Sequence, residues 1–209
     1  MLRALLLALM VLAVPAKETA PVVTDGPSFT ADGQLKFPAE YREWVYLTSG
    51  LDMTYGPNAP AAAHPVFDNV FVNPSAYRSF LRTGTWPDGT VIMLENRAAV
   101  GEVSINKRGK TQSTEVTGLE VHVKDSAHLK GDSWGFFNFK DKVSAKLIDR
   151  PASCYTCHEQ HAAVNTTFVQ FYPTLLPLAT EKKTLSEAYL TEMSAPAVIA
   201  DGKQGSVAR

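Results

Sequence analysis

The chain has 209 residues, of which 45% are hydrophobic, so it predicts one folded domain with tails and excludes a disordered protein. Its 20 basic and 21 acidic residues give a formal net charge of −1. We therefore expect neither a nucleic acid nor a membrane as a partner, because both would favour an excess of basic residues.

Residues 1–16 have the three parts of a secretory signal peptide. Arg3 supplies a positive charge, residues 4–14 form an apolar run, and Val14-Pro15-Ala16 offers small residues for cleavage. The apolar run is shorter than the ~20 residues needed to cross a bilayer. The pattern favours cleavage over an uncleaved membrane anchor, and it predicts export, which in a bacterium means the periplasm.

The next elements, in chain order, predict an α+β fold in which a few helices pack on an antiparallel β-sheet. Short turns between the strands favour antiparallel pairing over βαβ units. Helices are expected at 39–47, from 74 to about 84, and at 185–193, and a further short helix is expected to begin near residue 153. Strands or extended segments are expected at 68–72, 90–97, 100–105, 119–124, 134–139 and 167–171.

These elements suggest how the chain is divided. Residues 17–35 are rich in Ala, Pro and Thr and are expected to form a poorly ordered lead-in. Residues 36–175 are expected to form the domain, and residues 176–209 a C-terminal tail that is only partly ordered.

The only two cysteines lie in the stretch Ser153-Cys154-Tyr155-Thr156-Cys157-His158. A disulfide between them would close a very small loop and stabilise little. A catalytic dithiol usually follows a buried strand in a βαβ context, which is absent here. A zinc site would need His158 and His161 as well, which leaves little room for tetrahedral closure.

Covalent haem attachment is the interpretation that we favour. Cys-x-x-Cys-His supplies two thiols for the two vinyl groups of one porphyrin and a histidine for its iron. Cys154, Cys157 and His158 fit this pattern without a gap, and export agrees with it. One haem c per chain is expected, with His158 as the proximal ligand of the iron.

A second axial ligand is not singled out by any motif. His161 projects from the same helical turn as His158, so it is expected to be an ordinary polar residue. Each remaining candidate is more simply a core or surface residue than a ligand. These candidates are Met53, Met93, Met193, His64, His122 and His128.

From about Phe37 to Pro173 the chain resembles the cytochrome P-460 family, which includes the β-sheet cytochromes c′. The resemblance depends on the order and spacing of several short motifs. These are Tyr41-Arg42-Glu43-Trp44, Val70-Phe71-Val72-Asn73-Pro74, Trp86-Pro87-Asp88-Gly89-Thr90-Val91, Glu120-Val121-His122-Val123-Lys124-Asp125, Trp134-Gly135-Phe136-Phe137, the cysteine motif, and residues 168–173.

The resemblance implies a mono-haem protein on an antiparallel sheet, often a homodimer, with a five-coordinate iron open to small molecules. In the namesake enzymes, which oxidise hydroxylamine, a lysine makes an extra bond to the porphyrin. Here the strand at 90–97 has no lysine, and Leu94 is the expected occupant of that position. The nearest lysines, Lys107 and Lys110, are expected in a turn that faces water, so no extra haem bond is expected.

Strand alternation gives two versions of the distal pocket. If Leu94 faces the iron, Ile92 does too, and the pocket is mainly apolar. If the register is off by one, Glu95 and Arg97 face the iron, as a proton acceptor and as a stabiliser of a polar ligand.

Two functions from different classes follow from these expectations. The first is an exported cytochrome whose open iron binds a small nitrogen ligand such as nitric oxide. The second is a periplasmic oxidoreductase that oxidises hydroxylamine and passes electrons to a small redox carrier, and a simple electron-transfer cytochrome is a third.

Overall fold

The computed structural model describes residues 25–55 and 64–195, and the expected signal peptide lies outside these residues. The strands are β1 (Leu35–Lys36), β2 (Val45–Leu51), β3 (Val66–Val72), β4 (Thr90–Val100), β5 (Thr111–Gln112), β6 (Gly118–Lys124), β7 (Trp134–Asn138) and β8 (Ser144–Ala145). The helices are η1 (Ala39–Glu43), α1 (Pro74–Thr83), α2 (Ser153–His161), η2 (Val169–Phe171), α3 (Leu176–Lys182) and α4 (Glu187–Ser194). Among the described residues, no helix is long and apolar enough to span a membrane.

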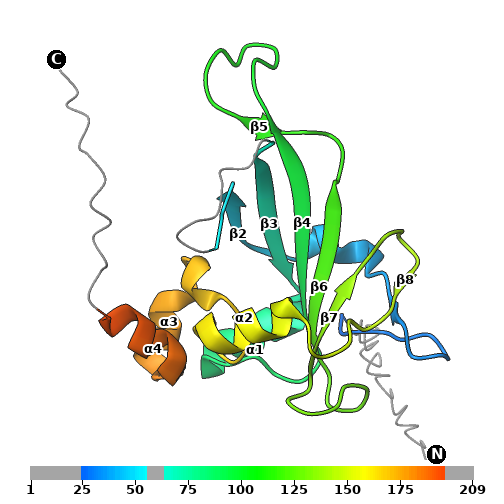
Figure 1. Ribbon diagram of the computed structural model, residues 1–209, viewed down its shortest axis with the longest axis vertical. Helices are drawn as coiled ribbons and strands as arrows, with labels where there is room; N and C mark the ends of the chain where they lie inside the picture. The colour runs from blue at the N-terminus through cyan, green and yellow to red at the C-terminus, as the bar shows by residue number, and fades with distance from the viewer. Residues whose placement is uncertain (1–24, 56–63, 196–209) are drawn as a thin grey trace, which may run out of the picture.

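One antiparallel sheet forms the centre of the fold, as the sequence predicted. Its strands pair in the order β2-β3-β4-β6-β7, with β5 paired to the far end of β4, while β1 and β8 form a separate pair. Helices α1–α4 gather at one end of the sheet, and η1 lies on its other side (Figure 1). The sheet therefore has two different faces, which we call the helix face and the η1 face.

Strand alternation assigns the core residues to these faces. In β6, Leu119, Val121 and Val123 point to the η1 face and join its hydrophobic cluster. In β4, Met93 belongs to that same cluster, whereas Ile92 packs in the cluster on the helix face. Glu120 and His122 therefore belong to the helix face.

Residues 39–47 are not one helix. The 3₁₀ helix η1 ends at Glu43, and the chain continues as β2, in which Val45 pairs with Val72. Val45 and Leu47 both pack in the cluster of the helix face. Their separation of two residues suits a strand, and pairing with β3 satisfies the backbone, so tertiary packing overrides the helical spacing.

Two further predicted strands are corrected. Of residues 100–105 only Val100 is in a strand; Glu102 and Ser104 have positive φ angles, and Ile105 is 93% exposed. Residues 101–110 lack a neighbouring strand that would hold them extended. The segment at 167–171 ends in η2 rather than in a strand.

The expected lead-in and tail both join the core where the structure describes them. Asp25 accepts a hydrogen bond from the backbone N–H of Ser75 at 2.7 Å, so it caps the start of α1, and Leu35 is 1% exposed. The side chain of Asn73, the residue before α1, instead accepts a bond from the N–H of Val91. At the other end, Ala179 of α3 is fully buried, so the core continues past residue 175.

Gly84 ends α1 in the left-handed conformation, with φ 73°, and has no space for a side chain. A Cβ there would lie 2.9 Å from both Lys182 Cβ and Thr184 Oγ1, whereas one at Gly89, with φ 83°, would meet open space. We expect Gly89→Ala to cost about 1–2 kcal/mol of strain and Gly84→Ala to cost more. Urea unfolding of both variants checks this, and equal costs would contradict the close packing of α3 on Gly84.

Candidate functional site

Helix α2 carries the three residues of the expected haem motif, and one of them, His158, lines a cavity. Cys154 and Cys157 lie three residues apart on the helix, and both are half-buried and free. His158 follows them and lines the cavity, which has a volume of about 370 Å³. This volume is typical of cofactor and ligand sites.

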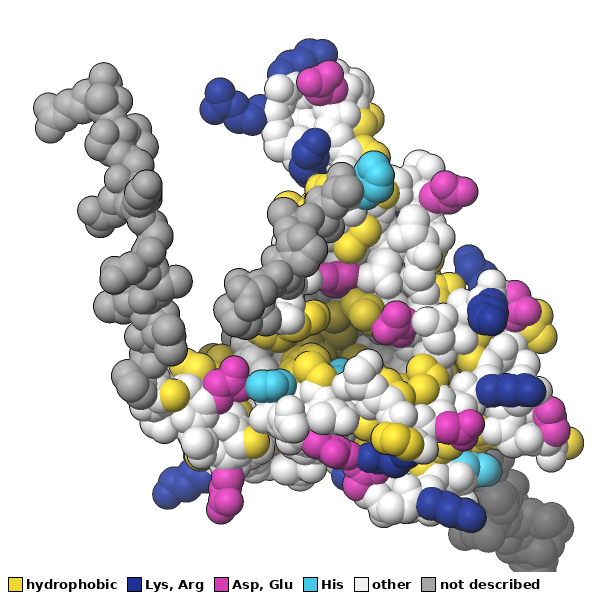
Figure 2. All heavy atoms as spheres, viewed as in Figure 1, with side chains coloured by type: hydrophobic (Ala, Val, Ile, Leu, Met, Phe, Trp, Pro, Cys, Tyr) yellow, Lys and Arg dark blue, Asp and Glu magenta, His cyan; other side chains and the backbone are white. Residues whose placement is uncertain are grey.

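The cavity lies between the helix face of the sheet and the segment that runs from α2 to η2. Figure 2 shows a hollow in the centre of the molecule with hydrophobic side chains on its walls. The sheet contributes mainly Thr48, Gly50, Val66, Asp68, Val70, Ile92, Leu94, Glu120, His122 and Phe136. The other side contributes His158, Thr167, Phe168, Phe171 and Tyr172, and Met53 and Tyr55 follow β2.

The imidazole of His158 is held in the orientation that a haem ligand needs. Its Nδ1 lies 2.7 Å from the backbone carbonyl oxygen of Thr166, so Nδ1–H donates and the lone pair remains on Nε2. Burial lowers the pKa of His158, with a smaller opposite effect from this hydrogen bond, and so favours the neutral ring. The ring packs against Phe168, Phe136 and His122, with centroids 4.1, 4.7 and 5.0 Å away.

The residues around α2 fix the helix relative to the sheet. The guanidinium of Arg150 lies 3.9 Å from the ring centroid of Tyr155 and makes ion pairs with Asp132 and Glu159. The hydroxyl of Tyr155 donates to the carbonyl of Ile148 at 2.8 Å. These contacts of Arg150 and Tyr155 hold in place the helix that carries both cysteines.

The zinc interpretation of the cysteine motif finds no support in this geometry. His161 turns away from the cavity, and its Nδ1 lies 3.1 Å from Glu192 Oε2 of α4. No group of three or more His, Cys, Asp and Glu side chains converges in a way that would hold a metal ion within residues 25–55 and 64–195. A zinc site built from Cys154, Cys157, His158 and His161 is thus not formed.

The structure places Leu94 on the cavity wall and excludes Glu95 and Arg97 from it. Leu94 lies between Val70 of β3 and Glu120 of β6 in the register of the sheet, on the helix face. Glu95 is fully buried on the opposite face, where Arg97 Nε donates to it at 2.6 Å. The alternative register, with Glu95 and Arg97 at the iron, is therefore wrong, because their side chains point away from the cavity.

Sequence reasoning missed two carboxylates that line the cavity, Asp68 and Glu120. Loss of surrounding water raises the pKa of Glu120, and the negative charge of Asp68 adds to this. The pKa of Asp68 is also raised by burial, although Asn96 donates a hydrogen bond to it at 2.5 Å. The alternation of β6 already showed that Glu120 shares a face with His122, but not that α2 and η2 cover this face.

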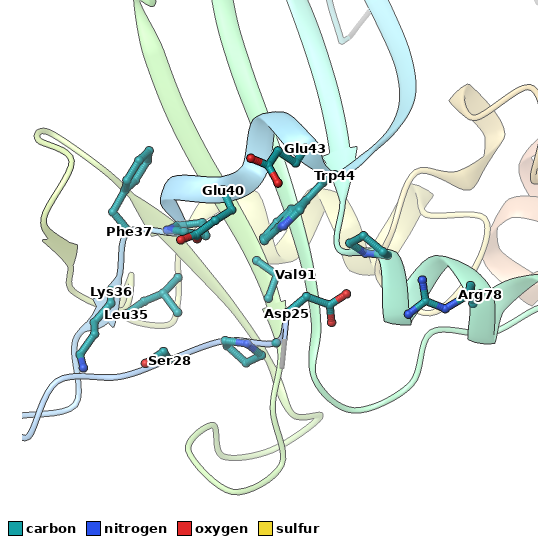
Figure 3. A pocket seen from close by; sticks show the side chains of 14 residues that line it. Asp25, Ser28, Leu35, Lys36, Phe37, Glu40, Glu43, Trp44, Arg78 and Val91 are labelled. Atoms are coloured by element: carbon teal, nitrogen blue, oxygen red, sulfur yellow. The ribbon is translucent and has the colours of Figure 1, made fainter. Parts of the chain in front are cut away.

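A second and larger cavity, of about 610 Å³, lies on the η1 face and is a poor candidate for the site. Figure 3 shows its walls: Glu43 is the last residue of η1 and Trp44 follows it, while Val91 lies on β4 and Arg78 on α1. Charged side chains of both signs line it, and no cysteine or histidine does. The chemistry of the cysteine motif therefore belongs to the cavity on the helix face.

The comparison with known families agrees with the site. The sequence profile of the family described as cytochrome P460 matches residues 38–169. The chain belongs to the cytochrome P460 family. The matched region contains the whole central sheet and α2, so it includes all the residues that line the cavity except Phe171 and Tyr172. No curated protein matched the chain.

Family membership makes this chain a haem cytochrome. Cys154 and Cys157 would hold the porphyrin, and His158 has a free Nε2 for the iron. Lys107 and Lys110, the nearest lysines to the strand of Leu94, are exposed in the loop between β4 and β5 and do not line the cavity.

Proposed function

We propose that this protein is an exported cytochrome that carries one haem c and binds a small nitrogen ligand, with nitric oxide as the leading candidate. The observation that carries the proposal is the hydrogen bond from His158 to Thr166, because it leaves the lone pair of Nε2 available for an iron. When bound, the haem supplies an iron that coordinates the ligand. The chain's part is to hold the haem from the α2 side and to shape the space beside it.

The walls near Leu94 favour a neutral diatomic ligand. Leu94 and Ile92 of β4 and Val70 of β3 form an apolar surface on the wall of the cavity. Such a surface offers no strong hydrogen-bond donor to a bound ligand, so it discriminates against charged ligands. Anaerobic titration of the reduced protein with nitric oxide tests the proposal: a stoichiometric change in the visible spectrum supports it, and an unchanged spectrum contradicts it.

The position of Glu120 on the cavity wall favours the second candidate, which is oxidation of hydroxylamine with transfer of electrons to a small redox carrier. This reaction releases protons, and a carboxylate with a raised pKa beside the cavity is suited to accept them. Leu94 is the expected occupant of the position that a cross-linking lysine holds in the namesake enzymes, so the reaction would have to proceed on an ordinary c-type haem.

We expect Glu120→Gln to slow any hydroxylamine oxidation by about 100-fold, because a positioned proton acceptor contributes 10²–10⁴-fold. Nitric oxide binding should change little, because that step transfers no proton. Turnover with a soluble electron acceptor measures the first effect, and Glu115→Gln, which removes an exposed carboxylate, is the control. Equal turnover in Glu120→Gln and the unaltered protein would remove Glu120 from the reaction.

A further inference from the structure

The carbonyl oxygen of Thr166, which accepts the hydrogen bond of the His158 ring, lies in a tight turn of the chain. The backbone N–H of Thr167 donates to the carbonyl of Val164 at 2.9 Å, and the N–H of Val164 donates to the carbonyl of Thr167 at 3.3 Å. Asn165 has a φ of 53°, a left-handed conformation that asparagine adopts more readily than most residues. The turn therefore holds the backbone of Thr166 in one orientation.

A tryptophan from a distant part of the chain holds this turn in place. Trp86 Nε1–H donates to Thr167 Oγ1 at 2.8 Å, and the same hydroxyl donates to the carbonyl of Val164 at 2.7 Å. Trp86 and Thr167 are each 1% exposed, so water does not replace either bond. The indole is fixed in its turn by Phe80 of α1, whose ring centroid lies 4.3 Å away. The hydroxyl of Thr167 thus links the indole to the turn, as an acceptor and as a donor.

A second contact, from the sheet, reaches the side chain of Thr166. His122 Nε2 lies 3.4 Å from Thr166 Oγ1, and the His122 ring stacks on Phe136 with centroids 4.0 Å apart. The residue that accepts the hydrogen bond of His158 is therefore held by β6 through its side chain and by Trp86 through the turn.

This support bears directly on the chemistry of the His158 ring. When Nδ1–H donates to a carbonyl oxygen, Nε2 becomes more basic, so it binds iron more strongly and stabilises the oxidised state. A carbonyl that is free to move away from Nδ1 loses part of this effect. Trp86 does not line the cavity, so it acts on His158 only through Thr167 and Thr166.

We propose that Trp86 and Thr167 are positioning residues, which set the strength of the bond between His158 and the haem iron by holding the carbonyl of Thr166 against Nδ1. The proposal rests on the haem c of the proposed function, with His158 as its proximal ligand. It gives a role at the haem to a side chain that lies outside the cavity.

The experiment compares the unaltered haem protein with Thr167→Val, which removes the hydroxyl, Thr167→Ser, which keeps it, and Trp86→Phe, which removes the indole N–H. In resonance Raman spectra of the reduced proteins, the iron–histidine stretching band should shift to lower wavenumber in Thr167→Val and Trp86→Phe, and return towards its original position in Thr167→Ser. At a fixed potential the ratio of reduced to oxidised iron should rise about tenfold in the first two, the lower end of the effect of losing such partners.

Trp44→Phe is the matched control, because Trp44 lines the cavity on the η1 face, and it should change neither measurement. An unchanged band in both Thr167→Val and Trp86→Phe would overturn the proposal, as would a shift in Thr167→Ser equal to that in Thr167→Val. Failure of the proposed function has a different signature. Absence of the band from the unaltered protein would disprove the proximal role of His158 and this proposal with it, whereas the expected shifts in a protein that binds no nitric oxide would disprove the nitric oxide proposal alone.

Discussion

Replacing Glu95 with alanine should lower the free energy of unfolding by about 2–4 kcal/mol, because it leaves several buried polar groups without their partner. The carboxylate is fully buried and accepts hydrogen bonds from Tyr41, Arg42 and Arg97 at 2.5–2.7 Å. Without Glu95 the hydroxyl of Tyr41 loses its hydrogen-bond acceptor, and water does not replace it, because Tyr41 is only 3% exposed. Urea unfolding at neutral pH measures the effect.

The contribution of Glu95 should also depend on pH. Burial alone would raise its pKa, but the hydrogen bonds from Arg97 and Tyr41 and the charges of Arg42 and Arg97 together hold the pKa below its ordinary value. The unfolded state then binds the proton more readily, so the stabilisation is present at neutral pH and is lost as the pH falls through the folded-state pKa. Glu95→Gln should therefore be less stable than the unaltered protein at neutral pH and approach it in acid.

Glu181→Gln, which changes an exposed carboxylate on α3, is the control for these measurements. A cost of Glu95→Ala no greater than that of this control would show that the network of Tyr41, Arg42 and Arg97 adds nothing to stability.

Replacing His158 with alanine should leave the haem attached through Cys154 and Cys157 but remove its proximal ligand. Resonance Raman spectra of the reduced protein should lose the iron–histidine stretching band, and added imidazole should restore an iron–imidazole band by entering the space that the ring leaves. His161→Ala is the matched control, because His161 lies on the same helix and pairs with Glu192 instead. An unchanged band in His158→Ala would mean that another residue is the proximal ligand.

Local sequence patterns predicted the sheet well where one face is apolar and the other polar. The strict alternation of residues 119–124 matches β6, and the proline at the first position of α1 matches its start. The prediction was wrong for residues 39–47 and 100–105, because the presence or absence of a partner strand decided those segments. Such pairing joins residues that are distant in the chain, and local spacing does not report it.

For the site too, the sequence predicted what depends on neighbouring residues and missed what depends on contacts between distant parts of the chain. Cys154, Cys157 and His158 are adjacent in sequence, so their motif was recognisable, and alternation from Leu94 correctly placed Ile92 beside it. Glu120 and Asp68 were not recognised, because polar residues on alternate strand positions normally face water. They line a cavity only because α2 and η2, at residues 153–171, cover the sheet.

The most direct test of the account is the mass of the exported protein after it has been denatured and freed of loosely bound pigment. We predict the mass of the processed polypeptide plus one haem, held by thioether bonds at Cys154 and Cys157. A mass that corresponds to the polypeptide alone would contradict the covalent haem, and with it the proximal role of His158.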